Sequence, residues 1–489
     1  MSRKISSRLN KENIERGIRY LQRNGITQTL YKASERLSRD EDEADYETWL
    51  GIHLPDAQTL KEQREEGFRN RYKISILVPA YETSSVFLRE MIESVISQSY
   101  TNWELCIADG SSSDIVKNCV MDMVGRYGAD LGSNRIKYQK LDKNYGISVN
   151  SNKALEMATG DYVGLLDHDD LLTPNALYEV VSLLQTGICE EGCVTHNKLL
   201  AVYSDEDKID GVTGRHFDYH KKPDFNLDLL RTNNYVCHFF VVSSSVARRV
   251  GGFRTEFNGA QDHDFILRCV EDAPKGSVAH IAKVLYHWRA HADSTADHPE
   301  SKLYAYEAGK RAIEAHLERM AVEAQVMYTP HLGFFRIRYI PGDERVAVMS
   351  KAEWDVVKQS DLSGIEEEYI MVLNDNLRPL TPNWQEELKG HLVRAEVGAV
   401  AGKILDKRNR VESAGYTKNE EGKPIANFKG LKGHYSGYLH RAGLQQEVDG
   451  LPLDCMMVKK AALTRGAAGL SMSKEYIAVY DPYAVFRRK

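Results

Sequence analysis

Three carboxylates gather within four residues of the first half of the sequence. Asp167, Asp169 and Asp170 directly follow the apolar run at residues 162–166. Carboxylates this close repel one another, and a divalent cation relieves that repulsion, because Mg²⁺ and Mn²⁺ prefer oxygen ligands and share them with substrate phosphates. The pattern therefore indicates a metal that holds a diphosphate. The alternative is an acidic loop in which Asp170 or Thr173 caps the next helix.

The elements around this triplet alternate between strand and helix. Apolar runs predict strands over residues 74–79, 103–108, 136–140 and 162–166. Helical spacing predicts helices over residues 87–98 and 147–158, and another that follows Ser111 and runs to about Tyr127. This alternation predicts a parallel α/β sheet, in which ligands bind at the carboxyl ends of the strands. Polar segments follow three of the strands, and we expect them to meet at one edge: residues 79–82, 109–111 and 167–170.

Glycine-rich phosphate loops are missing from this sheet. Neither G-x-x-x-x-G-K-[S/T] nor G-x-G-x-x-G follows the first strand. Both motifs cradle phosphates with backbone amides, so their absence argues against P-loop enzymes and nicotinamide-dependent dehydrogenases. A metal would then have to hold the phosphates.

The composition is that of an ordinary globular chain. Its 489 residues suggest two to three domains, and a net charge of -6 provides no general attraction to nucleic acid. Seven scattered cysteines fit a reducing cytosol, and a zinc site at Cys189, Cys193 and His196 is disfavoured because a fourth ligand is missing. No apolar stretch is long enough for a transmembrane helix, and the basic N-terminus has no apolar core behind it, so we do not expect it to be a secretion signal. We therefore expect a cytoplasmic protein.

We expect residues 1–70 to form a polar, charged and helical region. Apolar residues recur at helical spacing over residues 14–37, with a break at Gly25. The apolar face is narrow, which favours a solvated helical arm over a helix that docks on a membrane surface or on a partner.

Five short motifs occur in order within this α/β region, and together they resemble a family 2 glycosyltransferase of the GT-A fold. The similarity spans about residues 72–296 and is strongest to bacterial enzymes of surface polysaccharide and O-antigen assembly. It implies a Rossmann-like nucleotide-diphospho-sugar transferase domain over residues 71–322. The motifs are I-L-V-P-A-Y at 76–81, W-E-L at 103–105, D-G-S at 109–111, N-Y-G-I-S at 144–148 and L-D-H-D-D at 166–170.

The resemblance assigns roles to residues of these motifs. It implies that Asp169, with Asp167, holds Mn²⁺ or Mg²⁺, and that the ion neutralises the departing diphosphate. Asp167 also faces the ribose. Members of the family usually carry two acids before the Gly-Ser pair, whereas Ala108 precedes the single acid here. The residues that the resemblance implies for nucleotide binding are Pro79, Tyr81, Glu82, Asp109 and Asp167.

Later motifs supply the remaining candidates. Asp262, in the run G-A-Q-D-H-D, matches the base that removes the proton from the acceptor hydroxyl in an inverting transfer. The alternative is that Asp262 caps the following helix. His287, in Y-H-W-R-A-H, is predicted as a further metal ligand. Acids in these later runs are predicted to line the sugar or acceptor site, although a charge run is also typical of a solvated face: Asp205, Glu206 and Asp264.

The second half contains a weaker copy of the first. Residues 368–376 and 380–382 mirror residues 161–174, but Asn374 and Asn376 stand where acids are expected and only Asp375 is acidic. Amides bind a divalent cation more weakly than carboxylates. Residues 342–368 are too few for the first two strand-helix units, and a base-bearing loop is missing between Gly469 and Tyr480. We predict an incomplete, non-catalytic GT-A-like domain over residues 323–489.

Taken with the resemblance, these features predict a metal-dependent, inverting glycosyltransferase. We expect it to move a sugar from a UDP- or dTDP-sugar to a glycan or lipid-linked glycan of the bacterial surface, with peripheral association at the inner membrane face as an alternative to a free cytoplasmic protein. The first rival is a non-catalytic glycan-binding scaffold, which the complete acid set of the first half disfavours. The second is a sugar nucleotidyltransferase, which needs a glycine-rich basic loop after the first strand.

Overall fold

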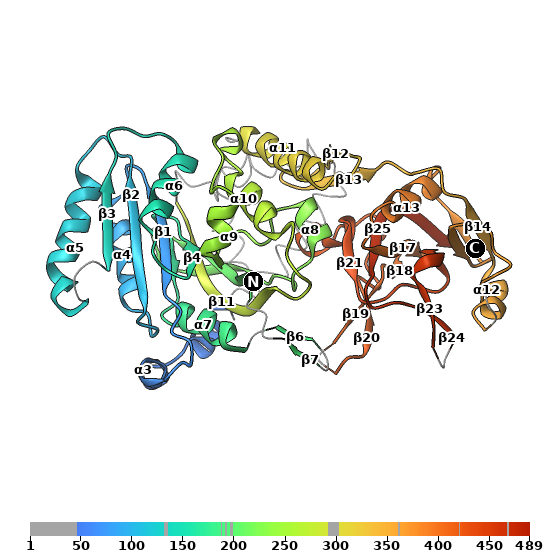
Figure 1. Cartoon of the computed structure of the whole chain (residues 1–489), viewed down its shortest axis with the longest axis horizontal. Coiled ribbons are helices and arrows are strands. Elements are labelled where there is room, and N and C mark those ends of the chain that lie inside the picture. The colour runs from blue at the N-terminus through green and yellow to red at the C-terminus, as the bar shows by residue number, and fades with distance from the viewer. Residues whose placement is uncertain are drawn as a thin grey trace, which may run out of the picture. The chain divides into compact units, whose positions relative to one another are not determined.

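The computed structural model describes residues 46–131, 135–186, 188–190, 193–195, 199–291, 303–359, 362–419, 421–466 and 469–489. Two units share these residues (Figure 1). The first unit takes the described parts of Arg39–Phe225 and Asn234–His316, and the second takes Asn226–Asn233 and Leu317–Lys489. The predicted helices over residues 14–37 and His196 lie outside the described residues, as do the side chains of Cys189 and Cys193.

The first unit is built on one mixed sheet whose strand order is β3-β2-β1-β4-β10-β8-β11-β5, with β9 beside β8. Strands β1 to β4 are parallel, as the sequence predicts. The later strands mix both directions: β10 is antiparallel to β4 and to β8, while β11 is parallel to β8. Their bounds are β1 Ile74–Ala80, β2 Trp103–Asp109, β3 Ile136–Lys140, β4 Tyr162–Leu165, β5 Leu171–Leu172, β8 Ala201–Asp210, β9 His216–His220, β10 Phe240–Ser243 and β11 Val278–Ala290.

Amphipathic helices cover this sheet. In α4 the buried residues Leu88, Met91, Ile92 and Val95 recur at helical spacing and join the core formed by the parallel strands. Figure 1 shows α4 and α5 beside strands β1 to β3. The helices of this unit are α3 Ala57–Glu65, α4 Ser85–Ile96, α5 Ile115–Leu131, α6 Ile147–Met157, α7 Ala176–Thr186, α9 Ser244–Arg249, α10 Gln261–Val270 and α11 Leu303–Arg319, the last ending in the second unit.

The described end of the N-terminal region packs on the first unit. Residues 46–53 are helical, and α3 follows with Asp56 as its N-cap. Tyr46 is buried and donates a hydrogen bond of 2.7 Å to the Asp207 carboxylate. Its ring stacks on Trp49 and Tyr219. The region is therefore anchored by aromatic residues at its described end.

The second unit repeats the larger part of the first sheet. Its order β14-β15-β22-β17-β25-β16 corresponds, strand for strand, to β1-β4-β10-β8-β11-β5, with the same parallel and antiparallel pairings. The predicted internal repeat is thus present in the topology. The strands are β14 Val346–Met349, β15 Tyr369–Leu373, β16 Leu377–Pro379, β17 Val397–Leu405, β22 Cys455–Lys459 and β25 Ile477–Arg488.

Two parts of the first unit have no counterpart in the described portion of the second unit: strands β2 and β3, and helices α9 and α10. Nothing pairs with the free edge of β14 in the way that β2 and β3 extend β1. Between β22 and β25 stands a hairpin, β23 Leu463–Gly466 and β24 Gly469–Met472, where the first unit has α9 and α10. In the described residues, this hairpin stands where the first unit has the helix that bears Asp262.

Helix α8, Leu227–Thr232, belongs to the second unit although the chain reaches it from the first. Asp228 accepts hydrogen bonds from Arg231 at 2.8 Å and from both terminal nitrogens of Arg394. All three side chains are buried. The other elements of this unit include β12 Ala324–Tyr328, β13 Phe335–Tyr339, α12 Lys351–Val357, α13 Trp384–Leu392, β18 Val411–Ser413, β19 Tyr416–Lys418, β20 Pro424–Ala426 and β21 Gln446–Val448.

Candidate active site

The polar segments that follow β1, β2 and β4 meet at one edge of the sheet. Ala80 pairs with Asp109 at the ends of β1 and β2, and the Gly110 amide donates to the Ala80 carbonyl at 3.0 Å. The Leu166 amide donates to the Leu77 carbonyl at 3.2 Å and so places Asp167 beside β1. The predicted convergence of the strand ends is therefore seen.

Glu82 ties the first of these segments to the second. Its φ of 46° lies in the left-handed region. Its carboxylate accepts hydrogen bonds from the hydroxyls and the backbone amides of Ser112 and Ser113, which lower its pKa to about 2. Tyr81 beside it is half exposed. These contacts shape the loop in which nucleotide contacts were predicted.

Asp109 is wholly buried in the structure. Its carboxylate accepts from the Ser111 amide at 2.8 Å, from the Tyr138 hydroxyl at 2.7 Å and from the Lys140 ammonium at 3.1 Å. Both oxygens are therefore engaged by the protein, and Asp109 holds the Gly-Ser turn in place.

A small cavity of about 60 Å³ lies at this edge of the sheet. It brings together Pro79 after the first strand, Asp167 after the fourth and Asp262 from α10. The remaining walls are mostly apolar. They are formed by Leu77, Ile147, Ser151, Leu165, Leu166, Cys237, His238, Phe253, Gln261 and Tyr286.

The acidic triplet divides its side chains between the cavity and the protein interior. Asp167 is half exposed and lines the cavity. Asp170 is buried and accepts from the Tyr286 hydroxyl at 2.5 Å and from the Arg289 amide at 2.7 Å. It precedes the short strand β5 and does not cap α7. Asp169 lies between them and accepts from His291 Nε2 at 2.8 Å.

The triplet carries negative charge that its surroundings do not fully balance. Desolvation raises the pKa of Asp167, and repulsion from Asp169 adds to this, against the attraction of His238. Desolvation also raises the pKa of Asp170 well above its usual value, with further contributions from Asp169 and Asp167. A cation beside these carboxylates would oppose both shifts.

The structure distributes the histidines differently from the sequence prediction. His287 lies beside Asp207 at 2.5 Å and against His216, rather than with the triplet. The reason is the twofold alternation of β11: Tyr286 faces Asp170, so its neighbour faces the other side. His291, at the other end of the same motif, is the histidine that contacts Asp169.

Asp262 lies in the first turn of α10, and Ala260 is the N-cap. Its carboxylate therefore does not cap the helix but lines the cavity, where it accepts a hydrogen bond of 2.7 Å from the Asn234 amide. Negative charge in a first helical turn is favoured by the helix dipole. This placement leaves Asp262 available to accept a proton from a ligand in the cavity.

Asp264, two residues later, points into the protein. Its buried carboxylate pairs with Arg254 and with Arg268, whose Nη2 lies 2.7 Å away. It is not among the residues that line the cavity. The structure thus places Asp264 in an internal ion-pair network.

The acids of β8 alternate between the two faces of the strand. Asp205 is buried and accepts from Tyr219, from the Lys222 amide and from His280, each at 2.7 to 2.8 Å. Glu206 faces the other side and pairs with Lys222 Nζ at 2.8 Å. The ammonium of Lys222 and the nearby His238 outweigh desolvation and lower the pKa of Glu206 well below its usual value.

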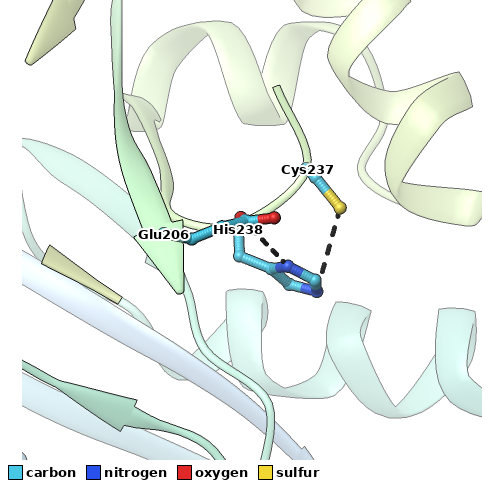
Figure 2. Close-up of side chains that lie close together, drawn as sticks. All are labelled: Glu206, Cys237 and His238. Carbon is cyan, nitrogen blue, oxygen red and sulfur yellow. Dashed lines mark hydrogen bonds and ion pairs between the residues drawn. The ribbon is translucent and has the colours of Figure 1, made fainter. Parts of the chain in front are cut away.

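His238 and Cys237 are cavity residues that the sequence analysis missed. His238 Nδ1 lies 3.3 Å from Glu206 Oε2, and its Nε2 lies 3.9 Å from Cys237 Sγ (Figure 2). The same Nε2 lies 4.0 Å from Asp167 Oδ2. Burial lowers the pKa of His238, but Cys237 and Glu206 outweigh burial and raise it well above its usual value. No motif marks this stretch. The signal available was two reactive side-chain types side by side before an apolar strand.

Residues 75–249 match the model of glycosyl transferase family 2. This domain belongs to that family. The family 2 match covers the three strand ends and the acidic triplet, and it ends before Asp262. The predicted GT-A-type α/β fold is confirmed by this match together with the strand order of the first unit.

Two curated relatives match the family 2 domain and most of the remaining chain. An uncharacterized protein of Sinorhizobium fredii, y4gI, is 32% identical over 83% of this chain and 50% of its own length. The O-antigen biosynthesis protein RfbC of Myxococcus xanthus is 27% identical over 80% of this chain and 33% of its own length. The chain therefore spans half of the first relative and a third of the second. Matches this long necessarily extend into the second unit.

Among solved structures, S. aureus TarS 1–349 is similar with a TM-score of 0.37 and 20% identity, over 50% of this chain and 65% of that one. Among the helices that the structure describes, none has the length and apolar character that crossing a membrane requires.

Proposed function

We propose that this protein is a metal-dependent, inverting glycosyltransferase that moves a sugar from a nucleoside-diphosphate sugar to a glycan or lipid-linked glycan of the bacterial surface. The observation that carries the proposal is one cavity lined by both Asp167 and Asp262. Asp167 would lie beside the departing diphosphate, and Asp262 would act as the general base. An inverting transfer needs these two groups around one sugar, because the acceptor attacks from the side opposite the diphosphate.

The acceptor class comes from the relatives. The M. xanthus relative is named for the biosynthesis of O-antigen, which is a surface polysaccharide. The match extends over 80% of this chain, so it includes the family 2 domain and part of the second unit. This likeness supports a polysaccharide acceptor rather than a protein or a small metabolite.

The donor set fits a hard divalent cation such as Mn²⁺ or Mg²⁺. At the triplet, ligand atoms of Asp167, Asp170 and His238 lie within 4.8 Å of one another, and Asp169, which His291 contacts at 2.8 Å, offers a further carboxylate beside them. The raised pKa of Asp167 is the shift expected of acids that lack a counter-ion. When bound, such an ion supplies positive charge to the departing diphosphate. The protein's own residues do the remaining work.

Asp262 would accept the proton of the acceptor hydroxyl, and Asn234 would orient its carboxylate. Glu82 and the Ser111–Ser113 turn would hold the loops beside the nucleotide. The second unit lacks counterparts of β2, β3 and α10 among its described residues, which supports a non-catalytic role in acceptor binding or support.

Thermal-shift measurements test this proposal. The protein is heated with UDP, dTDP, GDP or CMP, each with and without Mn²⁺. A ligand that binds only the folded state raises the melting temperature. We expect a shift with UDP or dTDP that depends on Mn²⁺. A folded protein that shows no shift with any nucleotide would contradict the proposal and favour a glycan-binding scaffold.

A further inference from the structure

Asp207, His216 and His287 form a second cluster of metal-ligating side chains in the first unit. They come from three neighbouring strands, β8, β9 and β11. One ligand atom of each lies within 4.8 Å of the other two. None of the three lines the cavity that Asp167 and Asp262 share. The cluster is therefore separate from the candidate active site, and the proposed sugar transfer does not use it.

The pairing of the strands places the three side chains on one face of the sheet. His287 stands directly opposite Asp207 in the parallel β8–β11 pair. His216 stands opposite Ile209 in the antiparallel β8–β9 pair, and Ile209 lies two positions from Asp207, on the same face. Tyr286, the neighbour of His287, points to the opposite face and lines the cavity.

The carboxylate of Asp207 lies between the two imidazoles. Its Oδ1 is 2.5 Å from His287 Nδ1, and its Oδ2 is 3.1 Å from His216 Nδ1. The two rings meet edge to face, with 4.3 Å between their centroids. Zinc ligands about 2.0 to 2.2 Å from the ion lie about 3.3 to 3.6 Å apart in a tetrahedral site, so moving these atoms apart by about 1 Å would admit the ion.

The charge of Asp207 is not balanced by a lysine or an arginine. Its side chain has no exposed surface, and its partners among the described residues are the two histidines and the hydroxyl of Tyr46. By contrast, the buried Asp264 of the same unit has the guanidinium of Arg268 at 2.7 Å. A carboxylate removed from water requires compensating positive charge. Either a protonated imidazole or a bound cation would supply it.

The ligand types favour zinc over the ions expected at the acidic triplet. Two imidazoles and one carboxylate are an established ligand set for Zn²⁺, with a fourth position left for water. Mg²⁺ and Mn²⁺ are better suited to carboxylates and water. The His216 side chain is 22% exposed, which gives an ion access to the cluster from solvent. Tyr46 donates to the Asp207 carboxylate at 2.7 Å and orients it, as outer hydrogen bonds do for metal ligands.

We propose that Asp207, His216 and His287 bind a Zn²⁺ ion that fastens β9 to β8 and β11. The ion binds one carboxylate oxygen and one nitrogen of each ring, and any proton on those nitrogens is released on binding. Because Tyr46 contacts the same carboxylate, the ion also supports the described end of the N-terminal region. The site is structural and does not depend on the proposed sugar transfer.

Metal analysis of the full chain tests this proposal. The protein is stripped with EDTA and dialysed against Zn²⁺ with excess Mg²⁺, and its metal content is measured by inductively coupled plasma mass spectrometry. Asp169→Ala is measured beside the unaltered chain, because the acidic triplet also offers ligands to zinc. We expect this variant to retain a single zinc ion. Zinc that only the unaltered chain binds would place the ion at the triplet, and zinc in neither would favour a protonated imidazole; both results overturn the proposal.

Variants of the cluster locate the bound ion. His216→Ala and His287→Ala, each made together with Asp169→Ala, are expected to weaken zinc binding by more than about tenfold, because each removes a ligand. Tyr46→Phe keeps the stacked ring and removes the hydroxyl, so we expect a loss of about tenfold, the lower end for an outer partner of a metal ligand. The control His53→Ala changes an exposed histidine that also stacks on an aromatic ring, and it is expected to keep full affinity.

Two further measurements distinguish a zinc site from an internal ion pair. X-ray absorption at the zinc edge counts the imidazole ligands in zinc-loaded Asp169→Ala, and we expect two, at about 2.0 to 2.1 Å from the ion. Zn²⁺ is expected to raise the melting temperature of Asp169→Ala and to leave that of its combination with His216→Ala unchanged. Unchanged zinc affinity in both folded histidine variants would overturn the assignment. If those variants do not fold, the spectrum decides, and fewer than two imidazoles would overturn it.

Discussion

Asn234 links the backbone of the Cys237 loop to Asp262. Its side-chain amide donates a hydrogen bond of 2.7 Å to the Asp262 carboxylate, and its amide oxygen accepts from the Cys237 backbone at 3.2 Å. The two contacts join α10 to the segment that leads into β10. The proposed base is therefore held by a residue 28 positions away in the sequence.

Replacing Asp262 by Asn is expected to abolish sugar transfer, because the amide cannot take the acceptor proton. Loss of a general base typically costs about 10²- to 10⁴-fold in rate. Release of the nucleoside diphosphate, measured with the donor that the thermal shifts identify, reports this rate. The Mn²⁺-dependent shift itself is expected to persist. Asp272→Asn, the same change at an exposed site beyond the same helix, is the matched control, and full turnover by Asp262→Asn would refute the assignment.

Replacing His291 by Ala is expected to weaken Mn²⁺-dependent nucleotide binding, since His291 contacts Asp169. A tenfold or larger rise in the dissociation constant, about the lower end for lost metal-site partners, is the expected size. Asp169→Ala is expected to remove the metal-dependent component of binding. Titration calorimetry with and without Mn²⁺ measures both effects. His287→Ala discriminates between the histidines: a loss of affinity in that variant alone would restore the prediction made from the sequence.

Replacing Asp264 by Asn is expected to destabilise the first unit. The change leaves Arg268, which is buried, and Arg254 without their shared carboxylate. Breaking a buried ion pair on one side costs about 3 to 5 kcal/mol. Urea unfolding of this variant beside Asp272→Asn measures the difference. A variant that keeps its stability but loses acceptor binding would show instead that Asp264 serves the substrate.

Replacing Glu447 by Gln is expected to stabilise the second unit at high pH. Burial, followed by repulsion from Asp228, raises the pKa of Glu447 from 4.5 to about 7. The folded state therefore keeps a proton that the unfolded chain has lost, so the unfolding free energy falls as the pH rises through that interval. Gln imitates the protonated form. Its melting temperature is expected to exceed that of the unaltered protein at pH 8 and to equal it near pH 4.

The control for this pH dependence is Glu421→Gln, at an exposed position of the same unit. It is expected to leave the melting temperature unchanged at both pH values. A Glu447→Gln variant whose melting temperature differs by the same amount at pH 4 and pH 8 would show that the carboxyl group of Glu447 does not titrate between them.

Much of the first unit could be predicted from local sequence patterns. The strands near residues 74, 103, 136 and 162 lie within one or two residues of their predicted bounds. Apolar runs and helical spacing report burial directly, and parallel strands necessarily bring their carboxyl ends to one edge. The weak copy in the second half was likewise visible, because a similar apolar run precedes Asn374 and Asp375 and the same Leu-Thr-Pro sequence follows them.

The partners of individual side chains depended on the tertiary structure. The sequence placed His287 in a motif with His291 but carried no information on which one faces Asp169: strand alternation alone would put both on one face, and they differ because β11 ends at Ala290, before His291. Asp264 and Asp262 look alike in sequence, yet positions two residues apart face nearly opposite sides of α10, so the first meets Arg254 and the buried Arg268 and the second lines the cavity. His238 reaches Glu206 and Asp167 only because β10 lies between β4 and β8.

The sequence by itself determined the class of element, the repeat and the acids that end the strands, since each depends on residues close together along the chain. Only the tertiary structure decided which histidine of the Y-H-W-R-A-H motif contacts the acidic triplet, which acids are buried in ion pairs, and that His238 lies between Glu206 and Asp167. These outcomes depend on strand order and on the face that each residue presents, and both follow from packing among segments that are distant in the sequence.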